Sequence, residues 1–161
     1  GQRSNKDTWL LAKVISNTTQ TINDVLLLDI GKESAVIGNV KMGDKVMLSS
    51  NLLLGEIVEV GKYDSKLQLY SASGRETGVL VGASGTPAVA VGQGSGNFTV
   101  VLPRGLDIAA GAKIYYASSS KHFVLGRVGA MKKRANNPFQ TLYFRYPVNF
   151  NDLDFVEIHH D

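Results

Sequence analysis

The stretch Gly82-Ala83-Ser84-Gly85-Thr86-Pro87 lies between two apolar runs, Val79–Val81 and Ala88–Val91. Serine proteases present their nucleophile in a similar way, as a serine followed by glycine, with a glycine shortly before the pair and a proline shortly after it. The same residues are also suited to a tight turn between two strands, because glycine can adopt a positive φ and proline can begin the next strand. The stretch therefore indicates either a protease nucleophile or a turn in a β-sheet.

The positions of the histidines favour the turn. A serine nucleophile needs an imidazole to take its proton and a carboxylate to orient that imidazole. The chain has three histidines, His122, His159 and His160, and all of them follow Ser84. A trypsin-like arrangement places its histidine before the serine, and it has an acidic residue where this chain has Ala83. The sequence therefore predicts no catalytic residue.

Short apolar or alternating runs recur along the whole chain, separated by Gly, Asn, Asp or Ser. Leu53–Val60 and Lys66–Tyr70 alternate as half-buried strands do, and Phe98–Leu102 and Thr141–Tyr146 are further examples. No segment of helical length shows the apolar stripe of an amphipathic helix. This pattern predicts an all-β chain of about a dozen short strands that form a sandwich or a barrel.

An internal echo suggests two similar halves. Each half has a glycine turn, a strand, a polar hairpin and then Leu-Gly with a second strand. These segments are Gly43–Val46 with Leu54–Ile57, and Gly111–Ile114 with Leu125–Val128. We therefore expect a linker remnant over residues 1–7, a first β-barrel over 8–76 and a second over 77–161, although either terminal strand could belong to the other barrel.

Composition excludes several kinds of site. The chain has 161 residues, no cysteine and a net charge of +3, which excludes thiolate chemistry and does not indicate nucleic acid. Gly92–Gly96 leads into a strand, whereas phosphate-binding glycine loops lead into a helix. Lys132-Lys133-Arg134 is interpreted as a solvated hairpin loop. His159-His160-Asp161 is interpreted as a tail. No metal or cofactor site is predicted.

The order of the motifs carries a family resemblance. Gly78–Val81 is followed by Ser84-Gly85, an apolar strand, Gly92–Gly96 and a last strand that Pro103 closes. This order resembles the centre of the rod shape-determining protein MreC family, and the segments of the internal echo lie where that family has similar ones. Two places differ from the family pattern: Tyr70-Ser71 replaces Thr-Asp, and the loop 117–124 is shortened and rewritten. The chain is identified as a divergent member.

The resemblance implies a fold and a function. The fold would be two small β-barrels arranged somewhat as in chymotrypsin-like proteases, without their catalytic residues. The function would be that of a non-enzymatic scaffold outside the cytoplasmic membrane, within the bacterial cell-elongation complex. Such proteins bind a penicillin-binding transpeptidase and self-associate. They reach MreD and the MreB system through an N-terminal membrane anchor and coiled coil that this sequence lacks. Neither nucleic acid nor membrane contact is expected of this fragment.

The aromatic segment Phe139–Tyr146 provides a candidate binding surface. In a strand, Phe139, Thr141 and Tyr143 would share one face, and Leu142, Phe144 and Tyr146 the other. One face should be core, and aromatic residues on the other would suit a protein partner. We expect Phe139 and Tyr143 to contact a partner. The alternative is that both faces are buried.

Two other function classes stay open at this point. One is a divergent chymotrypsin-like serine protease, which a fluorophosphonate probe that labels Ser84 would support. The other is a periplasmic adaptor of an export system, which also combines small β-barrels with a coiled coil. A long helical hairpin flanked by β segments on both sides would identify the adaptor.

Overall fold

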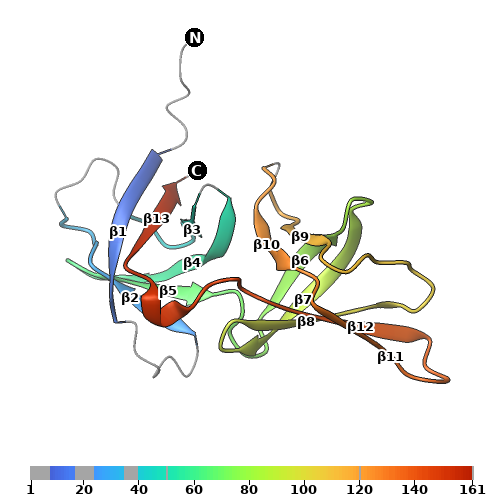
Figure 1. Ribbon diagram of the computed structural model, residues 1–161. Coiled ribbons are helices and arrows are strands. Elements are labelled where there is room, and N and C mark those ends of the chain that lie inside the picture. Colours follow the sequence, from blue (N-terminus) through green and yellow to red (C-terminus); the bar gives the residue numbers. More distant parts are fainter. Residues whose placement is uncertain (1–7, 17–23, 35–39, 50, 120, 161) are drawn as a thin grey trace, which may run out of the picture. The chain divides into compact units, whose positions relative to one another are not determined.

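The chain is built of strands. The computed structural model describes residues 8–16, 24–34, 40–49, 51–119 and 121–160, so the expected linker remnant at 1–7 lies outside the described residues. Within them, thirteen strands and one single-turn 3-10 helix, Phe150–Asp152, are present (Figure 1). No helix in this described part is long and apolar enough to cross a membrane. The predicted all-β class is confirmed.

Two compact units divide the chain. Residues 1–69 and 148–161 form one unit, here called barrel 1, and residues 70–147 form the other, barrel 2. The division at Tyr70 differs from the sequence-based boundary at 77, and the last strand belongs to barrel 1 rather than to barrel 2. The reason is pairing: that strand hydrogen-bonds to two strands from the first part of the chain. Apolar alternation alone does not show which neighbours a strand chooses.

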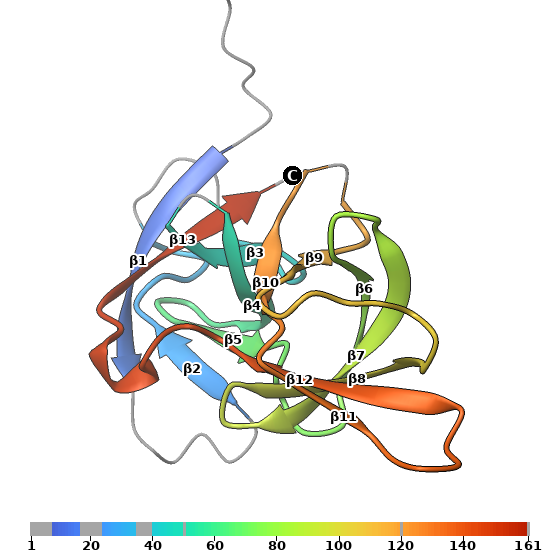
Figure 2. The ribbon, with the colours of Figure 1, turned by 45° about the vertical axis from the view of Figure 1, so that its right-hand side comes forward.

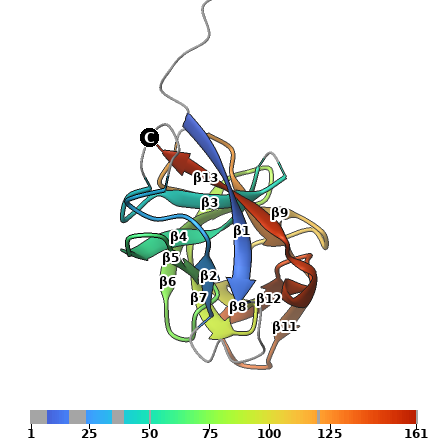
Figure 3. The same cartoon turned by 90° about the vertical axis from the view of Figure 1, so that its left-hand side faces the viewer.

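Barrel 1 is a closed ring of six antiparallel strands (Figure 3). Within barrel 1, each strand pairs with two others in the order β1-β2-β5-β4-β3-β13 and back to β1. Within the described residues, closure leaves barrel 1 without a free sheet edge for another chain. Side chains such as Leu28, Leu53 and Leu67 fill the interior and are fully buried. The strands are β1 (Thr8–Ser16), β2 (Val25–Leu28), β3 (Lys45–Leu48), β4 (Leu52–Val60), β5 (Ser65–Leu69) and β13 (Phe155–His160).

Barrel 2 has seven strands in the order β11-β12-β8-β7-β6-β9-β10 (Figure 2). The first and last strands of this order, β11 and β10, both come from one segment, Val124–Lys133. Its first half, β10, pairs with β9, and its second half, β11, pairs with β12. The seven strands are β6 (Glu76–Val81), β7 (Thr86–Gly94), β8 (Asn97–Pro103), β9 (Lys113–Tyr116), β10 (Val124–Arg127), β11 (Ala130–Lys133) and β12 (Phe139–Arg145).

A bend at Val128–Gly129 separates the two halves of that segment. The Gly129 N–H donates to the Tyr143 carbonyl at 2.9 Å, which brings the chain from β9 across to β12. After the bend, β11 and β12 run on together as a hairpin (Figure 2). This hydrogen bond joins the end of β10 to β12 and so completes barrel 2. Beyond it, the β11–β12 hairpin is connected to the rest of the sheet through the pairing of β12 with β8.

The internal echo of the sequence is also an echo of structure. In barrel 1, the Gly43 N–H donates to the Ile57 carbonyl at 2.8 Å, and the Ile57 N–H donates to Asp44. In barrel 2, the Gly111 N–H donates to the Val128 carbonyl at 2.9 Å, and the Val128 N–H donates to Ala112. The same reciprocal pair of bonds thus closes the β3–β4 hairpin and the β9–β10 hairpin.

The Ser-Gly stretch is a turn, as the histidine positions indicate. Gly82 and Gly85 have φ values of +74° and +66°, which a residue with a Cβ rarely adopts. Thr86 pairs with Val81 at the start of the β6–β7 hairpin. The Ser84 hydroxyl lies 3.2 Å from the Thr86 hydroxyl. Ser84 therefore stands at an exposed hairpin tip, beside another hydroxyl.

Candidate protein-binding face

Strand β12 presents alternate side chains to the two sides of its sheet. Gln140, Leu142 and Phe144 are buried, whereas Phe139 and Tyr143 are 50% and 37% exposed. The structure therefore places both predicted contact residues on one outer face. The alternative that both faces of this segment are buried is wrong.

Packing in the core fixes which way β12 faces. The Phe144 ring stacks on the Phe98 ring with centroids 4.4 Å apart, and Tyr146 meets Phe98 edge-on at 5.2 Å. Sliding β12 by one residue would turn these rings outward and bring Phe139 and Tyr143 into the core. The stacked aromatic residues thus hold the other two at the surface.

The outer face extends onto the neighbouring strand β8. Thr141 is paired with Val101, and Phe139 is paired with Pro103. Val101 is 56% exposed. Because directly paired residues of an antiparallel sheet point to the same side, these side chains form one surface. The face is therefore continuous across two strands, and it is apolar along β8 beside Phe139 and Thr141.

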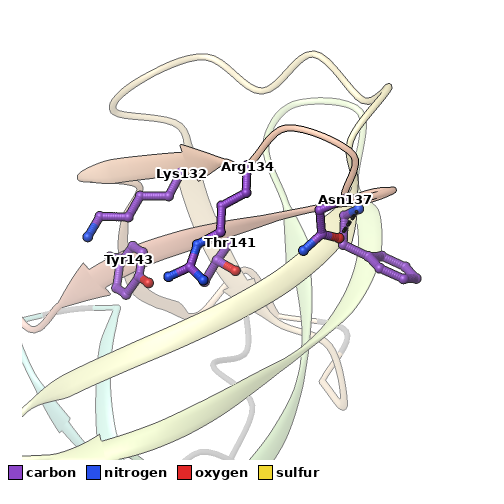
Figure 4. Close-up of a pocket in the computed structure, with 6 residues that line it drawn as sticks. Lys132, Arg134, Asn137, Thr141 and Tyr143 are labelled. Carbon is purple, nitrogen blue, oxygen red and sulfur yellow. Dashed lines mark hydrogen bonds between the residues drawn. The ribbon is translucent and has the colours of Figure 1, made fainter.

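A shallow hollow of about 170 Å³ lies where the β11–β12 hairpin turns. Lys132 and Arg134 form one side of it, and Asn137, Phe139, Thr141 and Tyr143 line the rest. In Figure 4 the guanidinium of Arg134 lies beside Thr141, and the Lys132 side chain reaches over Tyr143. This basic hollow and the outer face of β8 and β12 are together called the hairpin face below.

Local geometry keeps the hairpin turn in place. Asn136 adopts a left-handed conformation with φ +63°, which asparagine tolerates better than most residues. The Asn137 carboxamide oxygen accepts a hydrogen bond from the Phe139 N–H at 2.9 Å. The Arg104 guanidinium donates to the Arg134 carbonyl. These bonds fix the basic side of the hollow relative to β12.

The electrostatics of barrel 2 are one-sided. It contains nine basic and two acidic residues, a net charge of +7, whereas barrel 1 contains eight basic and twelve acidic residues, a net charge of −4. No aspartate or glutamate occurs between Ile108 and Asn151. The Lys132 ammonium lies 5.4 Å from the centre of the Tyr143 ring, a cation–π contact worth about 0.5–1 kcal/mol at an exposed site. The hairpin face is thus suited to an anionic and partly apolar partner.

Catalytic chemistry has no comparable basis among the described residues. No group of three or more His, Asp or Glu side chains in them could hold a metal ion. His122 packs edge-on against Tyr115 at 5.9 Å. His159 is buried in β13, so it is part of barrel 1 rather than of a tail.

The sequence predicted the aromatic side chains of this face, Phe139 and Tyr143, but not its basic side chains, Lys132 and Arg134. Lys132 and Lys133 belong to β11, and only Arg134 lies in the hairpin loop, so the solvated-loop interpretation is correct for Arg134 alone. The sequence does contain a signal for the basic residues. The region has no acidic residue, and the basic side chains Lys132 and Arg134 are two positions apart, so in a strand they share one face. That face is the one on which Thr141, paired with Lys132, and Tyr143 lie.

Several solved structures share this fold. MreC from Pseudomonas aeruginosa has a TM-score of 0.78 at 20% sequence identity, with 94% of this chain and 99% of that chain covered. MreC from Listeria monocytogenes has a TM-score of 0.72 at 19% identity, with 96% and 76% covered. MreC in a complex with the penicillin-binding protein PBP2 from Helicobacter pylori has a TM-score of 0.60 at 12% identity, with 97% and 100% covered.

The sequence itself identifies the family. None of the curated proteins matches the chain. The family description "Rod shape-determining protein MreC, barrel core" matches residues 14–160, which is nearly the whole chain. Membership excludes the protease alternative, because this family consists of structural proteins rather than enzymes. The chain belongs to the rod shape-determining protein MreC family, and it contains that family's barrel core.

Proposed function

We propose that this chain is the extracytoplasmic part of a scaffold in the bacterial cell-elongation complex, where it binds a penicillin-binding transpeptidase. The observation that carries the proposal is the shared fold with MreC from Helicobacter pylori, which is in complex with the penicillin-binding protein PBP2. That protein and this chain match over nearly their whole lengths. Family membership supports the scaffold role independently.

The hairpin face is the surface that we propose for the transpeptidase. Phe139 and Tyr143 would provide the apolar contacts, since exposed aromatic side chains are enriched among residues that dominate binding. Arg134 and Lys132 would surround them with positive charge. Aromatic residues beside arginine are a common composition of protein interfaces.

The remaining elements of the proposal concern the full-length protein. Location outside the cytoplasmic membrane is supported by similar structures of the major periplasmic domain of MreC. An N-terminal membrane helix and coiled coil would anchor the barrels and reach MreD and the MreB system. Self-association would bring several copies to one site.

A binding titration tests the proposal. The chain is titrated by calorimetry against the extracytoplasmic part of the elongation transpeptidase from the same source. We expect saturable binding with a dissociation constant in the micromolar range or tighter, about −8 kcal/mol or below. The double variant Phe139→Ala, Tyr143→Ala should weaken this binding at least about tenfold, since residues central to an interface each contribute more than about 1 kcal/mol.

The matched control removes exposed apolar side chains from barrel 1. Leu11 and Phe155 are 66% and 51% exposed, so Leu11→Ala, Phe155→Ala deletes similar surface outside the hairpin face. This variant should bind as the parent does. Equal loss in both variants would contradict the proposed surface, and no binding by a folded parent chain would contradict the proposed partner.

A further inference from the structure

Strand β11 is an exposed sheet edge. It is paired with β12 on one side, and no other strand of the described residues pairs with it. All four of its residues are exposed, which includes Met131 at 38%. An edge strand keeps alternate N–H and C=O groups unpaired, and these can accept one more strand from another chain.

The side chains of β11 restrict what can pair with it. Lysine on an edge strand is a common device against edge-to-edge association, because two such edges repel each other. Lys132 and Lys133 therefore disfavour pairing with a basic strand, which includes the same edge of a second copy. The same charges favour a strand that carries carboxylates, since opposite charges on neighbouring strands attract. The edge thus selects by charge as well as by hydrogen bonding.

A strand that pairs with β11 could also contact the basic side chains of the hollow. Lys132 and Arg134 both line it, so the two cations lie on the same side of the hairpin as Tyr143 (Figure 4). Successive outward side chains of an added strand lie about 7 Å apart, at twice the rise per residue. Carboxylates at alternate positions of such a strand would pass along the row of Lys132 and Arg134.

We propose that β11 binds an extended acidic segment of a partner protein, which adds to barrel 2 as a further strand. The segment has carboxylates at alternate positions, on the side of the hollow. Charge complementarity argues for this occupant, because barrel 2 has a net charge of +7 and no acidic residue between Ile108 and Asn151. The guanidinium fork of Arg134 can bind one of these carboxylates with two hydrogen bonds, which adds specificity to the charge.

This inference rests on the proposed function only in taking the hairpin as a binding element. It names the chemistry of the bound segment and not the protein that supplies it. The two ideas therefore fail separately. A transpeptidase that binds while acidic peptides do not would overturn the inference alone, and the reverse result would overturn the proposed partner alone.

The test uses short fluorescent peptides and the whole chain. The probe alternates glutamate and valine, so it can pair as an acidic strand. One control has the same residues with N-methyl groups on alternate amides, which preserves the charge and removes the strand hydrogen bonds. A second control alternates lysine and valine. Fluorescence anisotropy should show saturable binding of the probe and at least about tenfold weaker binding of both controls.

Protein variants locate the site. Lys132→Glu, Arg134→Glu should weaken probe binding at least about tenfold, because both changes replace attraction with repulsion. Lys113→Glu, Arg127→Glu is the matched control, with the same change of charge on exposed residues of β9 and β10. Circular dichroism confirms that each variant is folded. Binding of the probe should also weaken as salt rises, since exposed charges are screened beyond about 10 Å at 0.1 M.

Each contrary outcome overturns the proposal. Equal binding of the probe and its N-methylated form would mean attraction by charge without strand addition. Binding to vesicles of anionic phospholipid, without binding to the probe, would assign the hairpin to a membrane surface. Dimers in sedimentation that the probe does not displace would assign the edge to a second copy of this chain.

Discussion

Leu142 and Tyr143 are adjacent in β12 and have opposite roles. Leu142 is fully buried in barrel 2, whereas Tyr143 lies on the hairpin face. Leu142→Ala should lower the free energy of unfolding by about 2–5 kcal/mol, because it leaves a cavity in a packed core. Tyr143→Ala should lower it by less than about 1 kcal/mol, since it loses an exposed ring and one cation–π contact. Urea denaturation measures both values.

The effects of the two substitutions on partner binding should have the opposite order to their effects on stability. Tyr143→Ala should weaken binding of the partner while leaving the fold intact, and Leu142→Ala at low temperature should bind normally as long as it is folded. A large loss of stability in Tyr143→Ala would contradict the assignment of this residue to a surface role.

At two glycines, atoms of another strand lie too close to leave room for a side chain. A Cβ on Gly55 would lie 2.0 Å from the Gln68 carbonyl oxygen, and one on Gly126 would lie 2.9 Å from the Phe144 ring. Both glycines follow a leucine at the same place in the internal echo. The sequence showed that the position repeats, but not why, because the atom that excludes a side chain comes from a strand distant in the chain.

At the scale of elements, β8 and β11 should differ sharply in hydrogen exchange. From Asn97 to Val100, β8 is paired on both sides, with β7 and β12. The amides of this part of β8 should exchange only through global unfolding and be the slowest in barrel 2. Alternate amides of β11 have no strand partner and should exchange on the time scale of exposed groups. Exchange followed by NMR resolves the two strands.

The same exchange experiment is repeated in the presence of the glutamate–valine probe. The amides of β11 that face the free edge should then become protected, while those of β8 stay unchanged. Protection of β11 in the free chain, equal to that of β8, would contradict its description as an open edge.

Elements were predicted well where a local pattern determines them. The alternation in Thr141–Tyr146, the glycine turn before Pro87 and the β9–β10 hairpin each follow from residues close together in sequence. The bend at Val128–Gly129 was not predicted. It depends on a hydrogen bond from Gly129 to Tyr143, and no periodicity shows that one run of residues will serve two neighbouring strands.

At the scale of the whole molecule, the uneven distribution of charge should be measurable. Lys132→Glu, Lys133→Glu, Arg134→Glu and the control Lys32→Glu, Lys41→Glu, Lys62→Glu each lower the net charge from +3 to −3, since three reversals remove six charges. All six residues are exposed. The barrel 2 variant should elute from a cation exchanger at clearly lower salt than the control, because local clusters dominate such binding.

Elution of the two variants at the same salt would show that net charge alone governs the interaction. It would also remove the electrostatic argument for the hairpin face. The net charge of the chain does not reveal this asymmetry, because a mildly basic total is the sum of an acidic barrel and a strongly basic one.

The pairing of β13 with β1 and β3 has a consequence for biosynthesis. Barrel 2 lies in sequence between β5 and β13, so it is an insertion within barrel 1. A chain made from its N-terminus at about 5–20 residues per second completes barrel 2 before the last strand of barrel 1 exists. Until β13 arrives, β1 and β3 lack the strand that joins them. The first barrel to be started is therefore the last to be finished, because the strand that completes it comes at the end of the chain.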